Sequence, residues 1–419
     1  MEKLAVEGGR QLAGRLRIHG AKNAALPILA ATVLANGQYS IKDVPHLTDI
    51  TVMLDILAAL GAATTHQDST VTIDTRSLQS FHVPKEMMGQ MRSSIFLTGP
   101  LLARFGEVMV YPPGGCAIGE RKVDLHFEGL KALGASVTYY EDHIWCTAKE
   151  LQGADIHLAY PSVGATENIM MAATLAKGKT TIRNAAREPE IIDLQNFLIR
   201  MGARITGAGT ECIIIEGTTK LHTVDYQVIP DRIVAGTMIL AASMIDSKLE
   251  IENVVYEHIS PLIRTLKQCG VEIGQSSDII NVSSTKSSHL SYARVITEPY
   301  PGFPTDMQAQ LMSFLSLCKG TSVICETVFE GRFKHVPELV KLGANIEIIQ
   351  NEAHIHGVRR LFGAEVEATD LRAGAALILA GLAAEGTTVI SQVHHIDRGY
   401  ERIEDLLQSV GAHIKRIHS

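Results

Sequence analysis

The sequence lacks the features of a membrane, secreted or metal-binding protein. Its longest apolar runs, 26–35 and 373–384, are too short to cross a hydrocarbon layer of ~30 Å. The opening residues, MEKLAVEGG, contain no apolar signal-peptide core. The six cysteines are scattered without metal-ligand spacing, and the 17 histidines form no HExxH motif. We therefore expect a cytoplasmic protein without a metal site.

Basic excess and nucleotide-binding loops are also missing. The net charge of −7 argues against a general nucleic-acid binder, although it leaves room for a local basic cleft. Neither GxxxxGK[ST] nor GxGxxG occurs, so nucleotide hydrolysis and dinucleotide binding have no support. What is present is 46% apolar and 20% charged residues in a chain of 419, which suits a protein with large cores and two domains.

A repeat occupies the whole chain. Six apolar, helix-like stretches end at a glycine, and the successive gaps between these glycines are 73, 68, 68, 73 and 68 residues. Glycines taken three apart are always separated by 209 residues, half of the chain. The constant offset predicts a duplicated half that is itself three copies of one unit. The glycines are Gly61, Gly134, Gly202, Gly270, Gly343 and Gly411.

Each unit reads as a helix, a strand, a loop, a second helix, the glycine and two strands. The first helix is apolar all round and should be buried on every side. The second is amphipathic, and its glycine can take the left-handed conformation that ends a helix. Alternating segments such as 71–73 and 213–215 predict half-exposed strands. We predict an α/β fold of two domains, each with three units around buried helices. These helices are predicted at 24–35, 94–103, 166–176, 234–244, 307–317 and 371–384.

The offset also predicts where the domains meet. Residues 6–8 correspond to 215–217, so residues 1–21 match the tail of the first half. The second half stops eight residues after Gly411 and lacks such a tail. We therefore predict that residues 1–21 complete the C-terminal half. One domain would be 22–229, and the other 1–21 plus 230–419, with the active-site cleft between them.

Polar residues gather at the starts of the buried helices. Four of the six starts carry a cation, which opposes the helix dipole and is not explained by capping. This pattern favours a site for a multiply charged anion. For any single aspartate at these starts, ordinary N-capping is the alternative interpretation. The cations are Lys22, Arg92, Arg232 and Arg372, and the possible caps are Asp231, Asp306 and Asp370.

The loop 112–124 differs most from its counterparts in the other units. It is rich in glycine, and it places Cys116 close to Arg121 and Lys122. A thiol near positive charge has a lowered pKa and gains reactivity, so we expect Cys116 to be reactive. Two later loops carry Arg332 and Arg398. Both arginines could extend the anion site, or they could pair on the surface with the neighbouring Glu330 and Asp397.

Five long motifs resemble those of the UDP-N-acetylglucosamine 1-carboxyvinyltransferases, and the resemblance covers essentially the whole chain. They are KNAALPI from residue 22, GGCAIGERKVDLH at 114–126, SVGAT at 162–166, PGFPTDMQAQ at 301–310 and DRGYERI at 397–403. The resemblance implies two inside-out α/β domains of three βαβαββ units each, and no cofactor. It also implies the first committed step of peptidoglycan synthesis. In that step the sugar 3′-hydroxyl adds to C2 of phosphoenolpyruvate, C3 gains a proton, and the tetrahedral intermediate loses phosphate.

The resemblance further implies roles for individual residues. Cys116 would protonate C3 and could hold phosphoenolpyruvate covalently, while Asp306 would accept the proton of the 3′-hydroxyl. Lys22, Arg121 and Arg398 would surround phosphate and carboxylate, as a cationic cage for the developing charge requires. Asn23 and Arg372 would also contact phosphoenolpyruvate, and Arg232, Arg332 and Asp370 would line the same cleft. The implied UDP-N-acetylglucosamine contacts are Arg92, Arg121, Lys122, Val123, Asp124, Leu125, Ser162, Val163, Gly164, Asp306 and Val328.

The sequence departs from the family pattern at two positions near the nucleotide. Residue 122 is Lys where relatives often have Pro, and residue 160 is Tyr where some have Lys. We expect these changes to alter affinity without altering the reaction. Members with Asp in place of the loop cysteine resist fosfomycin, so Cys116 predicts sensitivity to it.

Three other functions are compatible with a chain of such repeat units. The shikimate-pathway enolpyruvyl transferase shares the fold and donor but lacks the Gly-Gly-Cys loop. RNA 3′-phosphate cyclase uses related repeat units, yet the acidic balance disfavours it. A non-catalytic duplicated copy would be expected to lose Cys116, Asp306 or the cations, and all are present. An active enzyme is therefore the favoured interpretation.

Overall fold

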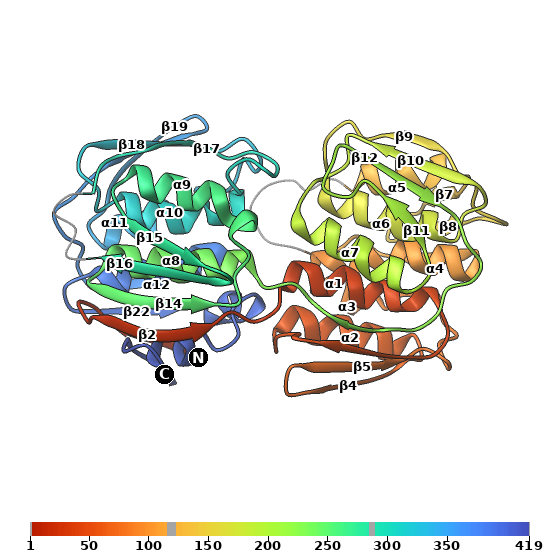
Figure 1. The fold of residues 1–419 in the computed structure, drawn as a ribbon, viewed down its shortest axis with the longest axis horizontal. Coiled ribbons are helices and arrows are strands. Elements are labelled where there is room, and N and C mark those ends of the chain that lie inside the picture. Colours follow the sequence, from red (N-terminus) through yellow and green to blue (C-terminus); the bar gives the residue numbers. More distant parts are fainter. Residues whose placement is uncertain (1, 115–122, 285–289, 419) are drawn as a thin grey trace. The chain divides into compact units, whose positions relative to one another are not determined.

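The computed structural model describes residues 2–114, 123–284 and 290–418. Cys116, Arg121 and Lys122, for which the sequence predicts functions, lie outside this range. The described chain forms two compact units, one of residues 20–114 and 123–229, the other of residues 2–19 and 230–418. Each combines helices with small mixed sheets (Figure 1). Among the described residues, no helix has the length and apolar character needed to cross a bilayer.

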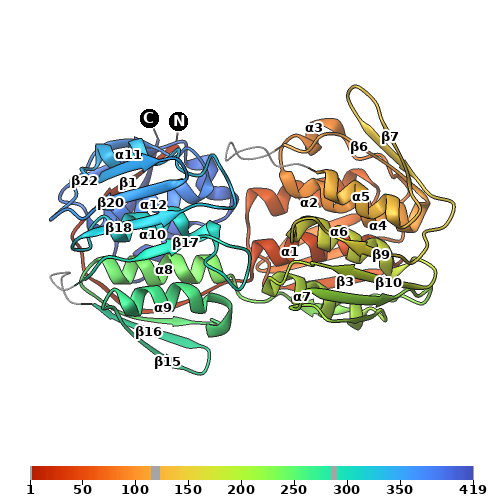
Figure 2. The same cartoon turned by 90° about the horizontal axis from the view of Figure 1, so that it is seen from above.

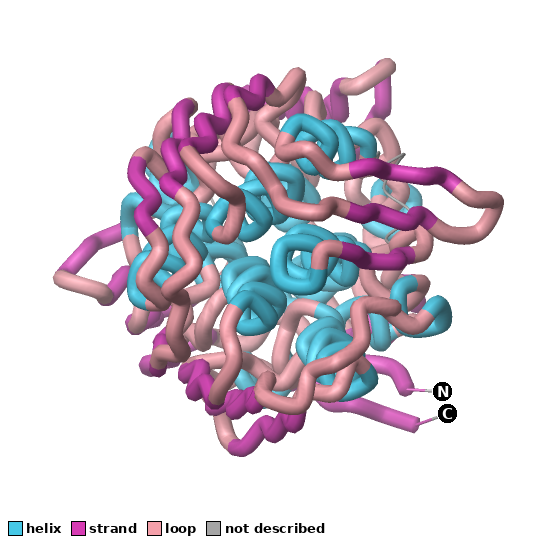
Figure 3. Tube along the Cα trace, turned by 90° about the vertical axis from the view of Figure 1, so that its right-hand side faces the viewer, coloured by secondary structure: helices cyan, strands magenta, loops and turns pink. Residues whose placement is uncertain are grey.

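The unit of residues 20–229 has three sheets within its described part, and they lie at its periphery around the helices (Figure 3). Their strand orders are β13-β3-β5-β4, β6-β8-β7 and β11-β12-β10-β9. The strands are β3 (Gln38–Lys42), β4 (Ala63–Gln67), β5 (Thr70–Asp74), β6 (Glu107–Val110), β7 (Ser136–Tyr139), β8 (Ile144–Thr147), β9 (Asp155–His157), β10 (Lys179–Arg183), β11 (Arg204–Thr206), β12 (Cys212–Glu216) and β13 (Asp225–Gln227).

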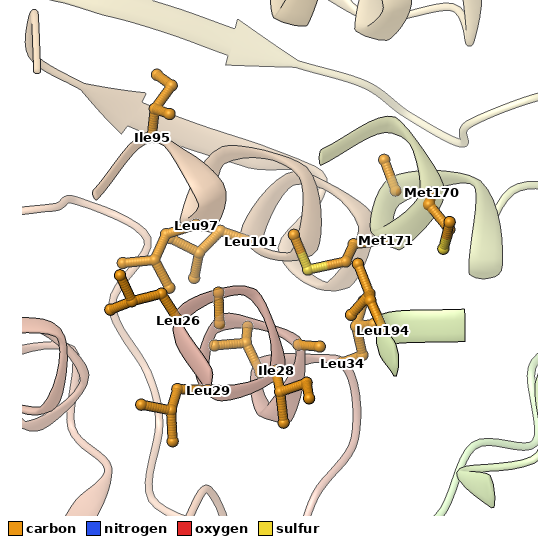
Figure 4. Packing of buried hydrophobic residues seen from close by; sticks show 14 of the residues in the cluster. Leu26, Ile28, Leu29, Leu34, Ile95, Leu97, Leu101, Met170, Met171 and Leu194 are labelled. Atoms are coloured by element: carbon orange, nitrogen blue, oxygen red, sulfur yellow. The ribbon is translucent and has the colours of Figure 1, made fainter. Parts of the chain in front are cut away.

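Three helical segments in this unit are buried on all sides, as their apolar sequences predict. They are α1 (Lys22–Ala31) with the 3₁₀ turn η1 (Thr32–Leu34), η2 (Arg92–Leu97) continuing into α4 (Thr98–Phe105), and α6 (Val163–Thr174). Leu26 and Leu29 of α1 lie in one cluster with Leu97 and Leu101 (Figure 4). The covering helices are α2 (Thr48–Ala59), α3 (Lys85–Met88), α5 (Asp124–Ala132) and α7 (Pro189–Arg200).

The unit of residues 2–19 and 230–418 repeats this plan. Its described sheets have the orders β15-β16-β14-β2, β17-β18-β20-β19 and β21-β22-β1-β23. The buried helix α8 (Arg232–Met244) packs against β14 and β16. Figure 2 shows α8 in one layer with α10 (Gln308–Leu315) and α12 (Leu371–Ala383). The strands are β1 (Glu2–Glu7), β2 (Leu12–Arg17), β14 (Ser247–Glu252), β15 (Glu272–Ser276), β16 (Ile279–Ser284), β17 (Arg294–Ile296), β18 (Thr321–Cys325), β19 (Asn345–Ile349), β20 (Glu352–His356), β21 (Glu365–Glu367), β22 (Thr387–Ser391) and β23 (His413–His418).

The helices of this unit also follow the repeat, with one buried helix in each copy. The buried ones are α8 (Arg232–Met244), η4 (Thr305–Met307) continuing into α10 (Gln308–Leu315), and α12 (Leu371–Ala383). The others are η3 (Tyr256–Ile259), α9 (Ser260–Gln268), α11 (Val336–Lys341), η5 (Val393–Arg398) and α13 (Ile403–Gln408). His394 and His395 lie in the 3₁₀ turn η5.

The two N-terminal strands pair with strands of the C-terminal half. β1 runs antiparallel between β22 and β23, with Leu4 opposite both Ile390 and Arg416. β2 runs parallel to β14, with Leu12 opposite Ser247. In the equivalent sheet of the other unit, β12 lies between β10 and β11. β1 therefore takes the place that β12 occupies one offset of 209 residues away.

The six repeat glycines adopt the left-handed conformation that the sequence predicts. Their φ angles run from 93° at Gly343 to 107° at Gly61. At that φ a side chain would be strained, so glycine ends each helix and turns the chain into the following strand. Five of the six buried helices begin two or three residues earlier than the apolar runs suggest, because residues such as Lys22 and Arg232 form their first turns, whereas α12 begins at Leu371 as predicted.

A buried carboxyl group lies within the core of residues 20–229. Glu167 of α6 is 1% exposed, and neither of its carboxyl oxygens has a hydrogen-bond partner in the described structure. Burial, together with the charges of Glu190 and Glu188, raises the pKa of Glu167 well above its ordinary value of 4.5. The folded state therefore keeps the proton of Glu167 at a pH where the unfolded chain has lost it.

This proton gives a testable pH dependence of stability. A raised folded-state pKa contributes stability that is present below about pH 4.5 and is lost as pH rises through the folded pKa. We expect Glu167→Gln to raise the thermal unfolding midpoint relative to the unmodified protein at pH 8, with the difference shrinking toward pH 4.5. The exposed Glu128→Gln is the control. An equal difference for Glu167→Gln at both pH values would contradict the assignment.

Candidate active site

Asp306 lies between two arginines in the unit of residues 230–418. Its Oδ1 accepts from Arg332 Nη2 at 2.5 Å, and its Oδ2 accepts from Arg372 Nη2 at 2.9 Å. The side chains of Arg332 and Arg372 are only 4% and 8% exposed, whereas Asp306 is 28% exposed. One face of the carboxylate is thus held by charge, and part of it remains open to solvent.

Two opposing effects act on the Asp306 carboxyl. Burial raises its pKa, but the charges of Arg372 and Arg332 and their hydrogen bonds outweigh burial, so the pKa lies well below its ordinary value. For Arg372 the signs are reversed. Burial lowers the pKa of its guanidinium, but the charge of Asp306 helps to raise that pKa by more, so the net shift is upward. Asp306 is therefore ionised throughout the working pH range, and it is a weak base while both arginines hold it.

The capping alternative is right for two aspartates and wrong for the third. Asp231 Oδ1 accepts from the backbone N–H groups of Ile233 and Val234, which caps α8. Asp370 caps α12 in the same way. Asp306 makes no capping bond and instead joins Arg332 and Arg372. Of the two alternatives for Arg332, surface pairing with Glu330 is not what the structure shows, since Arg332 is buried and bonded to Asp306.

Tyr400 ties the starts of the three buried helices together. Its hydroxyl bonds with Thr237 Oγ1 of α8 at 2.9 Å and accepts from Gln310 Nε2 of α10 at 3.2 Å. The guanidinium of Arg372, on α12, lies over its ring at 5.9 Å. Sequence reasoning placed Tyr400 only within the motif 397–403 and missed this role. The helix starts, and the polar groups on them, therefore meet at one place in this unit.

Glu326 organises the segment that carries Val328. The carboxylate is buried, and its Oε1 accepts from Thr297 Oγ1 at 2.8 Å and from the backbone N–H groups of Val328 and Phe329 at 2.8 and 3.1 Å. Its Oε2 accepts from Thr305 Oγ1, next to Asp306, at 2.9 Å. Glu326 therefore fixes two predicted site residues relative to each other. No motif in the sequence indicates it.

In the unit of residues 20–229, Lys22 is the first residue of α1. Its Nζ donates to Asp49 Oδ2 of α2 at 3.0 Å, and both side chains are buried, at 10% and 4% exposure. Asn23 follows Lys22 in the first turn. Asp49 was missed from the sequence. An acidic residue in the first turn of the second helix was the available signal, but local pattern alone does not connect it to Lys22.

The predicted nucleotide contacts lie at helix starts of the same unit. Ser162 caps α6 by accepting from Ala165 N–H at 3.4 Å, so Val163 and Gly164 form the first turn. Asp124 and Leu125 begin α5, and Val123 directly precedes it. Arg92 begins η2. Free backbone N–H groups at a helix N-terminus bind anions, so these helix starts suit the diphosphate of a nucleotide.

His126 has a defined tautomer next to this turn. Asn168 Oδ1 accepts from Gly99 N–H at 2.5 Å, so its amide nitrogen donates to Ile95 O and to His126 Nδ1 at 2.9 and 3.0 Å. His126 Nδ1 is therefore the acceptor, and the neutral ring carries its proton on Nε2. A Cβ on Gly164 would lie 3.1 Å from His126 Cε1, so Gly164 leaves room for the ring.

Three more residues that the sequence singled out lie on or near helical segments or at the surface. Arg232 begins α8, and its guanidinium lies 5.7 Å from the centre of the Tyr300 ring. Arg398 is the last residue of η5. Tyr160 is 43% exposed. The structure therefore groups Asp306, Arg332 and Arg372 in one unit, and Lys22 with Asp49 in the other.

Comparison with known proteins defines the class. The family model described as EPSP synthase (3-phosphoshikimate 1-carboxyvinyltransferase) matches residues 6–407. The chain is 50% identical over 417 residues to UDP-N-acetylglucosamine 1-carboxyvinyltransferase 2 of Caldanaerobacter subterraneus subsp. tengcongensis, covering 100% of both. It is 48% identical to UDP-N-acetylglucosamine 1-carboxyvinyltransferase of Finegoldia magna, covering 100% of this chain and 99% of the relative. The chain belongs to the EPSP synthase family and, within it, to the UDP-N-acetylglucosamine 1-carboxyvinyltransferases.

Solved structures agree with the fold. The enolpyruvyl transferase NikO from Streptomyces tendae is 26% identical, with a TM-score of 0.90 over 100% of this chain and 99% of that one. EPSP synthase from Acinetobacter baumannii is 18% identical, with a TM-score of 0.78 over the full length of both chains. The predicted α/β class, built from repeat units around buried helices, is confirmed.

Proposed function

We propose that this protein transfers the enolpyruvyl group of phosphoenolpyruvate to the 3′-hydroxyl of UDP-N-acetylglucosamine and releases phosphate. This reaction is the first committed step of peptidoglycan biosynthesis and takes place in the cytoplasm. The observation that carries the proposal is the ionised Asp306 held by Arg332 and Arg372, within a chain 50% identical over its full length to a relative bearing that name. Residues 22–229 form one transferase domain, and residues 1–21 with 230–419 form the other.

The positively charged side chains bind the anionic groups of the two substrates. Lys22, Arg121, Arg372 and Arg398 with Asn23 contact phosphoenolpyruvate, and Arg232 and Asp370 support them. UDP-N-acetylglucosamine binds the α6 turn 162–164, the residues 121–125, Arg92 and the Val328 backbone. A preorganised cationic site stabilises the charge that develops on the tetrahedral intermediate.

The reaction proceeds by addition and elimination. The 3′-hydroxyl oxygen attacks C2 of phosphoenolpyruvate, Asp306 takes the hydroxyl proton, and Cys116 gives its thiol proton to C3. In the second step C3 loses a proton and the bond between C2 and the phosphate oxygen breaks. When substrate charges draw the guanidinium groups of Arg332 and Arg372 away from Asp306, the pKa of that carboxyl rises, which makes it a stronger base.

Phosphate release from a mixture of UDP-N-acetylglucosamine and phosphoenolpyruvate tests the function. We expect the intact protein to release phosphate only when both substrates are present, and Cys116→Ser to be slower by about 10²–10⁴-fold, the usual value of a positioned acid. The half-buried Cys212→Ser is the matched control. No release by the intact protein would contradict the enzyme, whereas full activity in Cys116→Ser would remove only the assigned acid.

A further inference from the structure

The turn that carries Arg398 is compact. η5 follows Gln392, whose φ of 57° is left-handed, and ends at Arg398. The backbone N–H groups of Gly399 and Tyr400 both donate to Ile396 O at 3.0 Å. The position of the Arg398 backbone is therefore determined by the residues that hold its neighbours in this turn.

One of these residues is distant in sequence. Arg416 of β23 donates from Nη2 and Nη1 to Asp397 Oδ1 and Oδ2 at 2.7 and 3.0 Å. The same guanidinium donates from Nε and Nη2 to Glu404 Oε1 and Oε2 of α13 at 2.8 and 3.2 Å. Each carboxylate thus receives two bonds, an arrangement that fixes orientation as well as distance. Arg416 joins the Arg398 turn to α13.

The N-terminal strand completes this group. Arg416 Nη1 also donates to Glu2 Oε2 of β1 at 3.0 Å. The Arg416 side chain is 20% exposed and Glu404 is 5% exposed, so solvent screens these bonds less than those of a surface pair. The hydrogen bonds that Arg416 donates to Asp397 and Glu404 raise the pKa of its guanidinium. A lysine could not reproduce the geometry, because its single ammonium lacks the planar fork.

Arg398 therefore has a fixed residue on each side. Tyr400 is anchored to Thr237 and Gln310, and Asp397 is anchored to Arg416. We propose that Arg416 is a positioning residue, which holds the turn 396–400 so that the Arg398 guanidinium meets the charged groups of phosphoenolpyruvate. The proposal rests on the proposed function, in which Arg398 binds that substrate.

Steady-state kinetics test the proposal. We expect Arg416→Gln to raise KM for phosphoenolpyruvate about tenfold or more, since a misplacement of ~1 Å can cost about 100-fold. KM for UDP-N-acetylglucosamine should change by less than about twofold, because uniform loss of one substrate's binding appears in that KM alone. Arg416→Lys should restore part of the loss. Asp397→Asn should act like Arg416→Gln, and the double variant should be no worse than the more affected single one.

Arg15→Gln is the matched control. Arg15 also lies on a strand of this unit and also bridges two carboxylates, Glu250 and Glu252, but it is 60% exposed. We expect its kinetics to be unchanged. A readout that does not depend on activity is hydrogen exchange at the Gly399 and Tyr400 amides, which should be faster in Arg416→Gln and unchanged in Arg15→Gln.

The outcomes separate the two proposals. A protein that releases no phosphate contradicts the proposed function, while faster exchange at Gly399 and Tyr400 still supports the positioning of the turn. An active protein whose Arg416→Gln variant keeps its KM for phosphoenolpyruvate overturns the positioning role, even if its unfolding midpoint falls. Equal increases in both KM values would also overturn it, because they indicate general disruption.

Discussion

Asp306→Asn is expected to lower kcat by about 10²–10⁴-fold, the usual contribution of a positioned general base. Asparagine has almost the same shape and can still accept a bond from Arg332 or Arg372, but it cannot take the proton of the 3′-hydroxyl. The loss should appear in kcat because the proton moves in the transition state. Phosphate release at saturating concentrations of both substrates measures it, with the exposed Asp278→Asn as the control.

The depressed pKa of Asp306 adds a pH dependence to this result. kcat/KM reports groups of the free enzyme, and in the free enzyme Asp306 is ionised well below pH 4. The kcat/KM profile of the intact protein should therefore show no acidic limb from Asp306 near the ordinary aspartate range. A limb near pH 4 that disappears in Asp306→Asn would contradict the double arginine contact. A kcat for this variant equal to that of Asp278→Asn would contradict the role of Asp306 as the base.

Glu326→Ala is expected to destabilise the unit of residues 230–418 by about 3 kcal/mol or more. Its carboxylate accepts four hydrogen bonds, from Thr297, Thr305 and two backbone N–H groups. Each buried donor left without a partner costs about 1–3 kcal/mol. Calorimetry should show a lower unfolding midpoint, and hydrogen exchange at Val328 and Phe329 should accelerate.

An exposed glutamate of the same unit provides the control for this substitution. Glu347→Ala on β19 should change stability by no more than about 0.5 kcal/mol. If Glu326→Ala unfolds at the same midpoint as Glu347→Ala, with unchanged exchange at Val328 and Phe329, then the carboxylate does not organise this segment. A lower midpoint with unchanged exchange would place its effect elsewhere in the unit.

The architecture could be predicted from the sequence because local and periodic signals determine it. The left-handed glycines, the apolar helices and the offset that relates residues 6–8 to 215–217 are all visible in one dimension. Asp231 and Asp370 were recognisable as caps because a cap bonds to residues two and three positions later. These features need no knowledge of the tertiary structure.

The partners of the site residues could not be predicted, since tertiary folding brings them together. Asp49 is 27 residues from Lys22, and Arg372 is 66 residues from Asp306. Nothing local distinguishes Glu326, directly after β18, or Arg416, within β23, from the other charged residues of the chain. Arg332 illustrates this, because the sequence leaves open whether it pairs with its neighbour Glu330, whereas its partner in the structure is Asp306.

The pairing of β1 between β22 and β23 determines the order in which the protein can fold during synthesis. β1 is synthesised before the unit of residues 20–229, whereas both of its partner strands are synthesised after that unit. The described residues of the unit 20–229 all lie between β2 and α8 in the chain, so this unit can fold as soon as it has emerged. The other unit cannot complete the sheet β21-β22-β1-β23 until β23 has been synthesised. β1 thus stays without β22 and β23 while the unit of residues 20–229 is synthesised, and its sheet can close only after that unit has emerged.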